Sequence, residues 1–222
     1  MDKQTCIAIF VKSLDKGRVK TRLASVLDED TVMEIYRRFV LDLLGTMSGS
    51  GFEVRIFFYP PESESNVAGW LGEEYRYIPQ QGRDLGERMQ NAFLAAFAEG
   101  FRNVVLIGTD FPDLPVEIIE EAAKALASLD AVVGPAMDGG YYLIGFNSSR
   151  FPVEVFKDIE WGTPTVFERT MDVLRRCGYN WRVLPHWRDI DTYEDLMAFM
   201  REHEATPAGC LLTLDYLRAH RR

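Results

Sequence analysis

The sequence predicts an α/β fold in a single domain that covers residues 1–222. Short apolar segments typical of buried strands alternate with longer segments in which apolar residues recur at helical spacing. This is the pattern of a sheet covered by helices. The length of 222 residues suits one substantial hydrophobic core. The sequence contains no long linker rich in Ser, Gly or Pro and no internal repeat, so we expect one folding unit.

The first half of the chain alternates in this way from its start. Thr5–Lys12 is mostly apolar and predicts a buried strand, and Thr31–Leu44 has the apolar spacing of a helix. Phe52–Tyr59 predicts a second strand, ended by a pair of prolines, and Tyr75–Pro79 predicts a short third one. Leu85–Glu99 predicts a helix that ends, as helices often do, at a glycine.

The second half continues the alternation. Asn103–Gly108 predicts the fourth strand, and Val116–Leu129 predicts the next helix, with Pro115 in its first turn. The later predicted elements are, in order, strands at Ala131–Gly134 and Tyr141–Phe146, a helix at Val166–Cys177, a strand at Trp181–Leu184 and a helix at Tyr193–Arg201. Residues 205–222 are expected to form a C-terminal helical extension. Its basic and apolar residues from Cys210 onward favour a helix that closes the domain over one that binds a membrane or a partner.

Composition and charge argue against several classes of function. A net charge of -9 argues against generic binding to nucleic acid or to an anionic membrane, because both need a basic face. The 3 cysteines form no C-x-x-C pair and the 3 histidines form no zinc-enzyme motif, so neither a disulfide framework nor a zinc enzyme is indicated. The first apolar run is too short for a secretory signal, and no segment is long enough to span a membrane. We therefore expect a cytoplasmic protein.

The most informative stretch is Ile107-Gly108-Thr109-Asp110, where a predicted buried strand opens into a loop. Open α/β sheets bind their ligands at the carboxyl edge of the strands. A carboxylate placed there is well positioned to hold a divalent cation. The alternative interpretation is that Asp110 caps a helix or forms a turn ahead of Pro112.

A basic loop follows the first predicted strand. It contains Lys12, Lys20 and Arg22 as candidate phosphate ligands, and Gly17 allows the backbone to turn tightly between them. Neither a Walker A sequence nor a G-x-G-x-x-G motif is present. The alternative is an ordinary solvated loop.

A third candidate segment connects the third predicted strand to the following helix. Asp84 is a candidate N-cap, with Glu87 at the spacing of a capping box. Gly86 lies in the first helical turn, where glycine costs about 1 kcal/mol relative to alanine. A close approach by a nucleotide base or ribose would explain that glycine. We therefore include Gln80, Asp84 and Gly86 among the predicted nucleotide-binding residues.

The segment Asp138-Gly139-Gly140-Tyr141 joins two predicted strands. It suits a hairpin turn, and its open backbone beside a carboxylate and aromatic rings also suits a sugar or a small polar acceptor. Downstream, Trp161 either forms another wall of the same pocket or belongs to a helix entry. In that second interpretation Thr163 is the N-cap and Pro164 the first helical residue.

Asp189-Ile190-Asp191-Thr192 supplies two further carboxylates. Thr192 is a candidate N-cap with Asp195 as its capping-box partner, which leaves Asp191 free for another task. Asp110 and Asp191 are predicted to hold Mg²⁺ or Mn²⁺ jointly, since these hard ions prefer oxygen ligands and share their coordination with phosphates. Because unpaired carboxylates repel each other, Asp110→Asn is expected to leave the metal-free fold intact or slightly more stable.

Taken in order, five motifs resemble a bacterial family of nucleotide-diphospho-sugar transferases whose members are largely uncharacterised. The motifs are Phe10-Val11-Lys12 with Gly17–Ala24, Asp84–Met89, Gly108–Leu114, Gly134–Gly145 and Asp189–Thr192. The resemblance implies a three-layer α/β/α domain around a mixed, mostly parallel sheet, the GT-A fold of glycosyltransferases and sugar-nucleotide nucleotidyltransferases. It also implies that Asp110 occupies the metal-binding position of that superfamily and Asp191 a second metal-facing one.

Together these observations predict a metal-dependent transferase. The first prediction is a glycosyltransferase that uses a nucleotide-diphospho-sugar donor, with Asp110 and Asp138 as catalytic residues. The predicted acceptor or sugar site comprises Asp138, Gly139, Gly140, Tyr141 and Trp161. The alternative is a nucleotidyltransferase that joins a nucleoside triphosphate to a phosphorylated small molecule and releases pyrophosphate. A further alternative is a domain that binds nucleotide or protein without catalysis.

Overall fold

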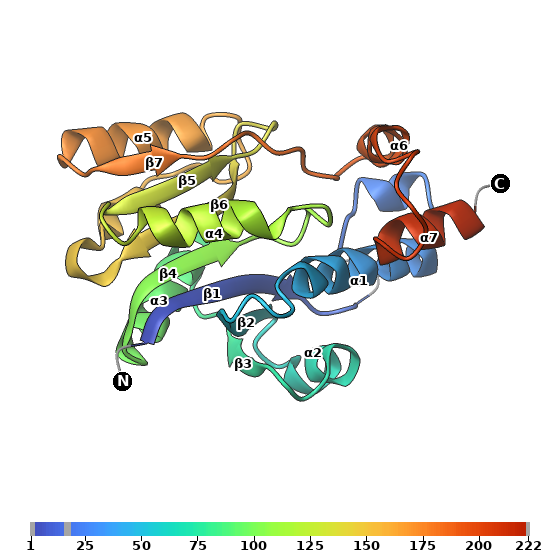
Figure 1. Cartoon of the computed structure of the whole chain (residues 1–222), viewed down its shortest axis with the longest axis horizontal. Helices are drawn as coiled ribbons and strands as arrows, with labels where there is room; N and C mark the ends of the chain where they lie inside the picture. Colours follow the sequence, from blue (N-terminus) through green and yellow to red (C-terminus); the bar gives the residue numbers. More distant parts are fainter. Residues whose placement is uncertain (1–2, 16–18, 221–222) are drawn as a thin grey trace.

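The computed structural model describes residues 3–15 and 19–220. Within these residues, seven strands form one sheet in the order β3-β2-β1-β4-β6-β5-β7 (Figure 1). The strands are β1 (Lys3–Lys12), β2 (Glu53–Tyr59), β3 (Arg76–Pro79), β4 (Phe101–Ile107), β5 (Ala131–Pro135), β6 (Tyr141–Asn147) and β7 (Trp181–Val183). Among these strands only β6 runs antiparallel to its neighbours, so the sheet is mixed and mostly parallel. The predicted fold class is confirmed.

Helices cover both faces of the sheet and complete the three layers. Side chains from α1 (Glu29–Thr46), α2 (Glu64–Leu71) and α4 (Val116–Ala125) enter the core on one face. Those from α3 (Leu85–Ala98) and α5 (Val166–Arg176) enter the core on the other face. Short 3₁₀ turns occur at Leu23–Ser25, Ser148–Arg150 and Val153–Phe156. Helix α2 was not expected from the sequence, because Ser, Asn and Gly within it have weak helical propensity.

Strand β1 shows why both faces need helices. Its alternate residues Ile7, Ile9 and Val11 lie in the core below α1 and α4, and Cys6 and Ala8 lie in the core below α3 and α5. All five side chains are fully buried. A strand with no solvated face has a nearly continuous apolar sequence, as this strand does.

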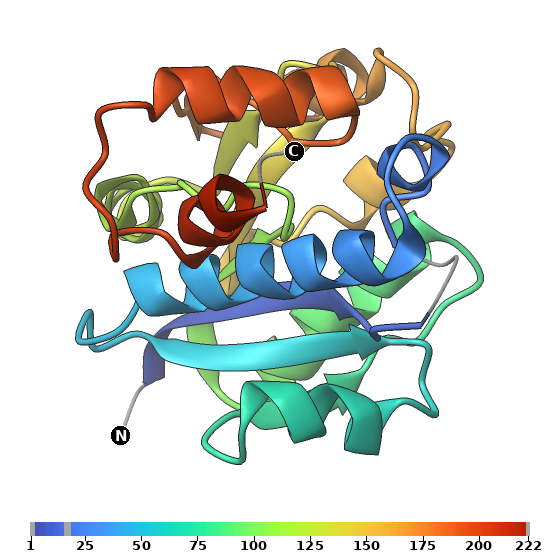
Figure 2. The same ribbon diagram turned by 90° about the vertical axis from the view of Figure 1, so that its right-hand side faces the viewer.

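The C-terminal helices add a third, smaller core outside the sheet. Helices α6 (Tyr193–Glu202) and α7 (Leu212–Ala219) lie over the outer side of α1 (Figure 2). The buried residues of this core include Phe39 of α1, Phe199 of α6 and Leu214 of α7. Leu23, from the segment that follows the basic loop, is buried in the same cluster. The C-terminal helices therefore pack against the segment that carries Leu23.

A buried carboxylate on α1 fastens α7 to this core. Asp42 is 7% exposed, and its two oxygens accept hydrogen bonds from the backbone N–H groups of Leu212, at 2.7 Å, and Thr213, at 2.9 Å. These are among the donors that the first turn of a helix leaves without a backbone partner. Asp42 thus acts as the N-terminal cap of α7 from another helix. Burial raises the pKa of this carboxyl, and the hydrogen bonds oppose that rise.

We expect Asp42→Ala to lower the free energy of unfolding by about 1–3 kcal/mol, because the two N–H groups lose a shared acceptor. Asp42→Asn retains one acceptor oxygen, so its loss should be smaller. Urea unfolding of the wild type and both variants measures the two losses. An unchanged unfolding midpoint in Asp42→Ala would show that α7 does not depend on this cap.

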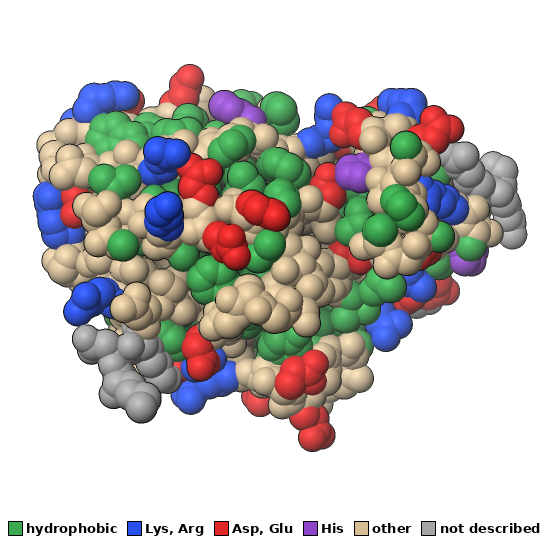
Figure 3. All heavy atoms as spheres, viewed as in Figure 1, with side chains coloured by type: hydrophobic (Ala, Val, Ile, Leu, Met, Phe, Trp, Pro, Cys, Tyr) green, Lys and Arg blue, Asp and Glu red, His purple; other side chains and the backbone are tan. Residues whose placement is uncertain are grey.

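The surface carries charges of both signs. The face in Figure 3 shows acidic, basic and apolar side chains interspersed. Among the helices within residues 3–15 and 19–220, none is long and apolar enough to cross a bilayer.

Candidate active site

A pocket of about 610 Å³ lies at the carboxyl edge of β1 and β4. The segments after β2, β3 and β5 reach the same edge, and so do the segments around Trp161 and Asp191. Strands β2 and β3 extend the sheet on one side of β1, whereas β4 starts the other side. The pocket therefore lies where the strand order switches direction, the usual ligand position in an open α/β sheet.

Most of the predicted site residues line this pocket. They are Lys12, Lys20, Arg22, Gln80, Asp110, Asp138, Gly140, Tyr141, Trp161 and Asp191. Asp84, Gly86 and Gly139 are not among the described residues that line it. Gly17 lies outside the described residues.

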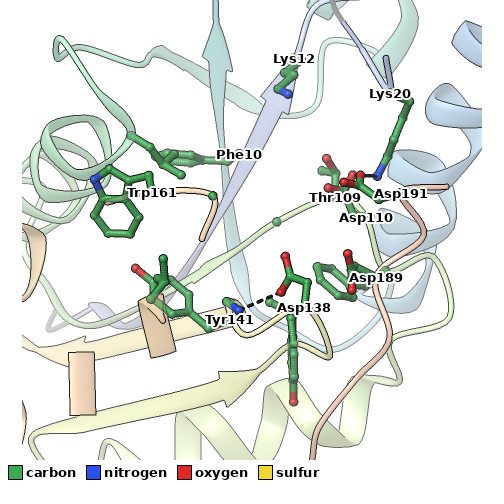
Figure 4. A pocket seen from close by; sticks show the side chains of 18 of the residues that line it. Phe10, Lys12, Lys20, Thr109, Asp110, Asp138, Tyr141, Trp161, Asp189 and Asp191 are labelled. Carbon is green, nitrogen blue, oxygen red and sulfur yellow. Dashed lines mark hydrogen bonds and ion pairs between the residues drawn. The ribbon is translucent and has the colours of Figure 1, made fainter. Parts of the chain in front are cut away.

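One end of the pocket is organised around the ammonium of Lys20 (Figure 4). The Lys20 Nζ lies 2.6 Å from Asp110 Oδ1, 2.8 Å from Asp191 Oδ1 and 2.6 Å from the carbonyl oxygen of Ile190. An ammonium has three donors, and here each has an acceptor. The Lys20 side chain is 3% exposed, whereas those of Asp110 and Asp191 are 40% and 38% exposed. The carboxylates therefore face both the lysine and the pocket.

The charges at this end support one another. Burial lowers the pKa of the Lys20 ammonium, but Asp110 and Asp191 outweigh burial and leave that pKa above its usual value. Burial raises the pKa of Asp191, but Lys20 and then Arg22 outweigh it and leave the pKa lowered. The Arg22 guanidinium lies 3.6 Å from Asp191 Oδ2 and is itself exposed. At neutral pH the lysine and Asp191 are therefore both charged.

Two expectations about Asp110 need correction. Asp110 is not a helix cap, since α4 begins at Val116 and its N-cap is Pro115. It is also not an unpaired carboxylate, because it forms an ion pair with Lys20. The expectation that Asp110→Asn would leave stability unchanged or raised is therefore wrong in its premise, since the mutation removes the negative charge of an ion-pair partner of a buried ammonium.

The neighbouring Asp113 serves a different purpose. It accepts a hydrogen bond from the indole Nε1 of Trp187 at 2.9 Å, and its other oxygen lies 3.4 Å from His203 Nε2. Asp113 thus fastens the segment after β7 to the loop after β4. It is not among the described residues that line the pocket.

A buried tyrosine contacts the carboxyl ends of both central strands, β1 and β4. The hydroxyl of Tyr36, on α1, accepts a hydrogen bond from the backbone N–H of Lys12 at 2.8 Å and lies 3.2 Å from Thr109 Oγ1. Burial raises the pKa of this hydroxyl, so it stays neutral. The helical spacing of Tyr36 predicts a place in the apolar core and gives no sign of these hydroxyl contacts.

The wall of the pocket opposite Lys20 is formed by the segment around Gly139, after β5, and the segment from Trp161 to Pro164. These two segments pack tightly against each other. Gly139 has a φ of 88°, and a Cβ there would lie 2.2 Å from the carbonyl oxygen of Pro164. Its own carbonyl accepts a hydrogen bond from the backbone N–H of Phe167 at 2.9 Å. The wall interpretation of Trp161 holds, because Trp161 lines the pocket. The helix-entry alternative is wrong, because α5 begins at Val166 with Thr165 as its N-cap.

The glycine in the first turn of α3 has an explanation within the chain. A Cβ at Gly86 would lie 2.8 Å from the indole of Trp161 and 2.6 Å from the carbonyl oxygen of Phe156. The close approach inferred from the sequence is thus made by Trp161. Direct contact of Gly86 with a nucleotide stays a prediction.

The structure also shows the contacts of the predicted residues at the start of α3 and just before it. Asp84 is the N-cap of this helix and accepts from the backbone N–H of Glu87 at 2.9 Å, as predicted. The Glu87 carboxylate does not accept from the backbone N–H of Asp84, as a capping box would require. It instead accepts hydrogen bonds from the backbone N–H and the guanidinium of Arg83. The amide of Gln80 is buried and donates to the carbonyl of Phe57 at 2.8 Å.

The predicted capping box of Thr192 with Asp195 is confirmed.

A second carboxylate pair lies beside the charged end of the pocket. Asp138 and Asp189 both line it (Figure 4), and Asp138 accepts from the backbone N–H of Gly140 at 2.8 Å. Burial, followed by the charge of Asp138, raises the pKa of Asp189 to about 6. No separate role for Asp189 was predicted from the sequence. Its proximity to Asp138 depends on the fold and has no local sequence signal.

The pocket also includes residues that were not predicted from the sequence. Phe10, Tyr59 and Arg88 line it, and the Arg88 guanidinium lies over the Tyr59 ring at 4.4 Å from its centre. The ring of Trp161 meets that of Tyr141 edge to face at 6.5 Å. Phe10 and Tyr59 lie near the carboxyl ends of predicted strands, and that position is the signal that the sequence offers for both.

The comparisons with known proteins identify relatives of this chain. Residues 44–163 match the family described as "Uncharacterized protein conserved in bacteria (DUF2064)". A search of curated proteins found no match. A solved structure named "putative nucleotide-diphospho-sugar transferase", from Desulfovibrio desulfuricans G20, is 39% identical over 97% of this chain and 94% of that one, with a TM-score of 0.92.

More distant solved structures share the fold. Rv0371c from Mycobacterium tuberculosis H37Rv, in complex with manganese, is 15% identical over 90% of this chain and 100% of that one, with a TM-score of 0.56. The inositol-1-phosphate CTP transferase from T. maritima is 13% identical over 92% of this chain and 96% of that one, with a TM-score of 0.55. The family match and the relative at 39% identity together show that the chain belongs to the DUF2064 family of bacterial proteins.

Proposed function

We propose that the protein is a metal-dependent glycosyltransferase that uses a nucleotide-diphospho-sugar donor. The observation that carries the proposal is the convergence of Lys20, Asp110 and Asp191 at one end of a pocket whose other end is aromatic. The relative at 39% identity is named for the same class of donor, which supports the proposal. Such a pocket offers charge for a diphosphate and flat surfaces for rings.

The cations of the pocket are proposed to bind the donor's phosphates. Lys12, Lys20 and Arg22 all line it, in a chain whose net charge is -9. Together with Arg88 they balance the four carboxylates among the described lining residues, Asp110, Asp138, Asp189 and Asp191, so the pocket is less acidic than the chain as a whole. In this proposal Lys12 and Arg22 hold the diphosphate against the ends of β1 and β4.

The donor set fits a hard divalent cation. Asp110, Asp191 and the carbonyl of Ile190 present oxygens that converge on one point, at 2.6–2.8 Å from the Lys20 Nζ. No group of three or more His, Cys, Asp or Glu side chains that could hold a metal occurs among residues 3–15 and 19–220. Mg²⁺ typically uses one or two carboxylates together with substrate phosphates and water. When bound, such a cation neutralises the diphosphate and stabilises it as a leaving group.

The acceptor is proposed to lie near Asp138. Its carboxylate, oriented by the Gly140 N–H, lies between the charged and aromatic ends of the pocket. A carboxylate there can accept a proton from an acceptor hydroxyl. Tyr141 and Trp161 form the neighbouring wall and suit the apolar face of a sugar ring.

The second candidate is a nucleotidyltransferase. The observation that favours it is the number of cations that line the pocket, since Arg88 joins Lys12, Lys20 and Arg22. A triphosphate carries more negative charge than the diphosphate of a sugar nucleotide and benefits more from these side chains. The inositol-1-phosphate CTP transferase, which shares the fold, is named for this chemistry.

The reaction products separate the two candidates. We expect purified protein with Mn²⁺ to release a nucleoside diphosphate from a nucleotide-sugar when the correct acceptor is present, and slowly by hydrolysis without it. Pyrophosphate release from a nucleoside triphosphate and a sugar phosphate would instead establish the second candidate. Full nucleotide affinity in EDTA, with no turnover under any metal, would indicate a binding domain without catalysis.

A further inference from the structure

The Lys20 ammonium already occupies a complete cation site. Its three donors meet Asp110, Asp191 and the carbonyl of Ile190, all within 2.8 Å. The side chain is 3% exposed, so water does not compete for these acceptors. The backbone of Lys20 has a φ of 46°, in the left-handed region that non-glycine residues rarely adopt. The loop thus holds a strained backbone while its side chain lies between the carboxylates.

The same two carboxylates are the proposed metal ligands. Mg²⁺ binds its oxygen ligands at about 2.0–2.1 Å, and no divalent cation can share the position of the ammonium. A dication beside Lys20 would also meet the charge of the lysine at close range. Metal binding at the point where these oxygens converge and the present position of Lys20 therefore exclude each other.

The lysine has an advantage over a free metal ion. It is tethered to the same chain, so it does not lose translational freedom when it binds the carboxylates. The two carboxylates alone leave most coordination positions of a divalent cation to water. A nucleotide favours the metal over the lysine at these carboxylates for two reasons. Its phosphates complete the coordination of the metal, and they offer the ammonium a new anionic partner.

We propose that Lys20 is a built-in counter-cation that keeps divalent metal out of the Asp110–Asp191 pair until a diphosphate enters the pocket. Metal and nucleotide then bind together, and Lys20 exchanges the carboxylates for a phosphate. The lysine's flexible four-carbon stem permits that movement. This inference rests on the proposed function, because it takes the metal and the diphosphate as ligands of this site.

The first test is a titration of Mn²⁺ without nucleotide, followed through the paramagnetic signal of the free ion. We expect Lys20→Met to bind Mn²⁺ at least about tenfold more tightly than the wild type, a change of about 1.4 kcal/mol. Equal affinities in the wild type and in this variant would overturn the inference.

Lys12→Met is the matched control for that titration. It removes the same charge from the same pocket, but the charge of Lys12 acts on Asp191 less strongly than those of Lys20 and Arg22. We therefore expect a clearly smaller gain in Mn²⁺ affinity from Lys12→Met. An equal gain in Mn²⁺ affinity from Lys12→Met and Lys20→Met would show that the loss of any positive charge from the pocket has this effect. That result would also overturn the inference.

The second test uses the wild-type protein and does not depend on the folding of a variant. The ammonium signal of Lys20 is followed by nitrogen-15 magnetic resonance, and Lys20→Arg assigns it. We expect the signal to persist unchanged with Mg²⁺ alone and to shift or disappear with Mg²⁺ and inorganic pyrophosphate together. A change with Mg²⁺ alone, or no change under any condition, would overturn the inference. Neither test requires a donor sugar, so both outcomes are independent of the glycosyltransferase assignment.

Discussion

Replacing Asp110 by asparagine is expected to lower kcat/KM by roughly 10²- to 10³-fold, because the metal site loses one of two carboxylates and a bound metal supplies several kcal/mol of charge stabilisation. Lys20 keeps Asp191 and the Ile190 carbonyl as partners. The accompanying loss in the free energy of unfolding should therefore be only about 1–2 kcal/mol. Titration of Mn²⁺ in the presence of nucleotide measures the effect on the metal site directly.

Asp113→Asn is the matched control for this prediction. It makes the same chemical change three residues away, at a carboxylate that binds Trp187 and faces His203. We expect it to reduce stability without changing the affinity for Mn²⁺ and nucleotide. If Asp110→Asn also bound Mn²⁺ as tightly as the wild type, Asp110 would be only the structural partner of Lys20.

Gly139→Ala is expected to have the largest effect on the shape of the pocket. The added Cβ would lie 2.2 Å from the carbonyl oxygen of Pro164, so the Trp161 segment must move. Backbone strain at this positive φ costs about 1–2 kcal/mol, and the collision adds about 1–3 kcal/mol. We expect a large loss of stability and weaker binding of the acceptor or sugar. Urea unfolding and nucleotide-sugar titration measure the two effects.

Gly162→Ala separates strain from collision. Gly162 has a similar φ of 80°, but nothing lies within 4 Å of the Cβ that an alanine would add. This variant should show only the cost of the strained backbone. If the two variants were destabilised equally, the contact between Gly139 and Pro164 would have no part in holding the pocket wall.

The edge of the sheet that forms the pocket was predictable because it depends on local patterns. The apolar sequences of the strands that end at Lys12 and Ile107 predict by themselves that Asp110 lies at the carboxyl edge of the sheet. Helix caps at Asp84 and Thr192 were predictable for the same reason, since a cap needs only its own side chain and the next turn. Helix α2 was not predicted because its packing on the sheet outweighs its weak propensity.

The arrangement within the site was not predictable from local patterns. Lys20 and Asp191 are 171 positions apart, and a lysine in a basic loop gives no sign of a left-handed backbone. Gly86 was recognised as a place of close approach, but its neighbour is Trp161, which lies far along the chain beyond β6. Contacts of this kind depend on topology, and the spacing of residues in one sequence does not reveal them.

The most direct test of the central claim is a calorimetric titration of the wild-type protein with a panel of nucleotide-diphospho-sugars in the presence of Mn²⁺. We predict that at least one donor binds, that EDTA weakens its binding, and that Asp110→Asn weakens it to a similar extent. Absence of binding by every donor in the panel, with protein shown to be folded, would contradict the assignment of this pocket to a nucleotide-sugar.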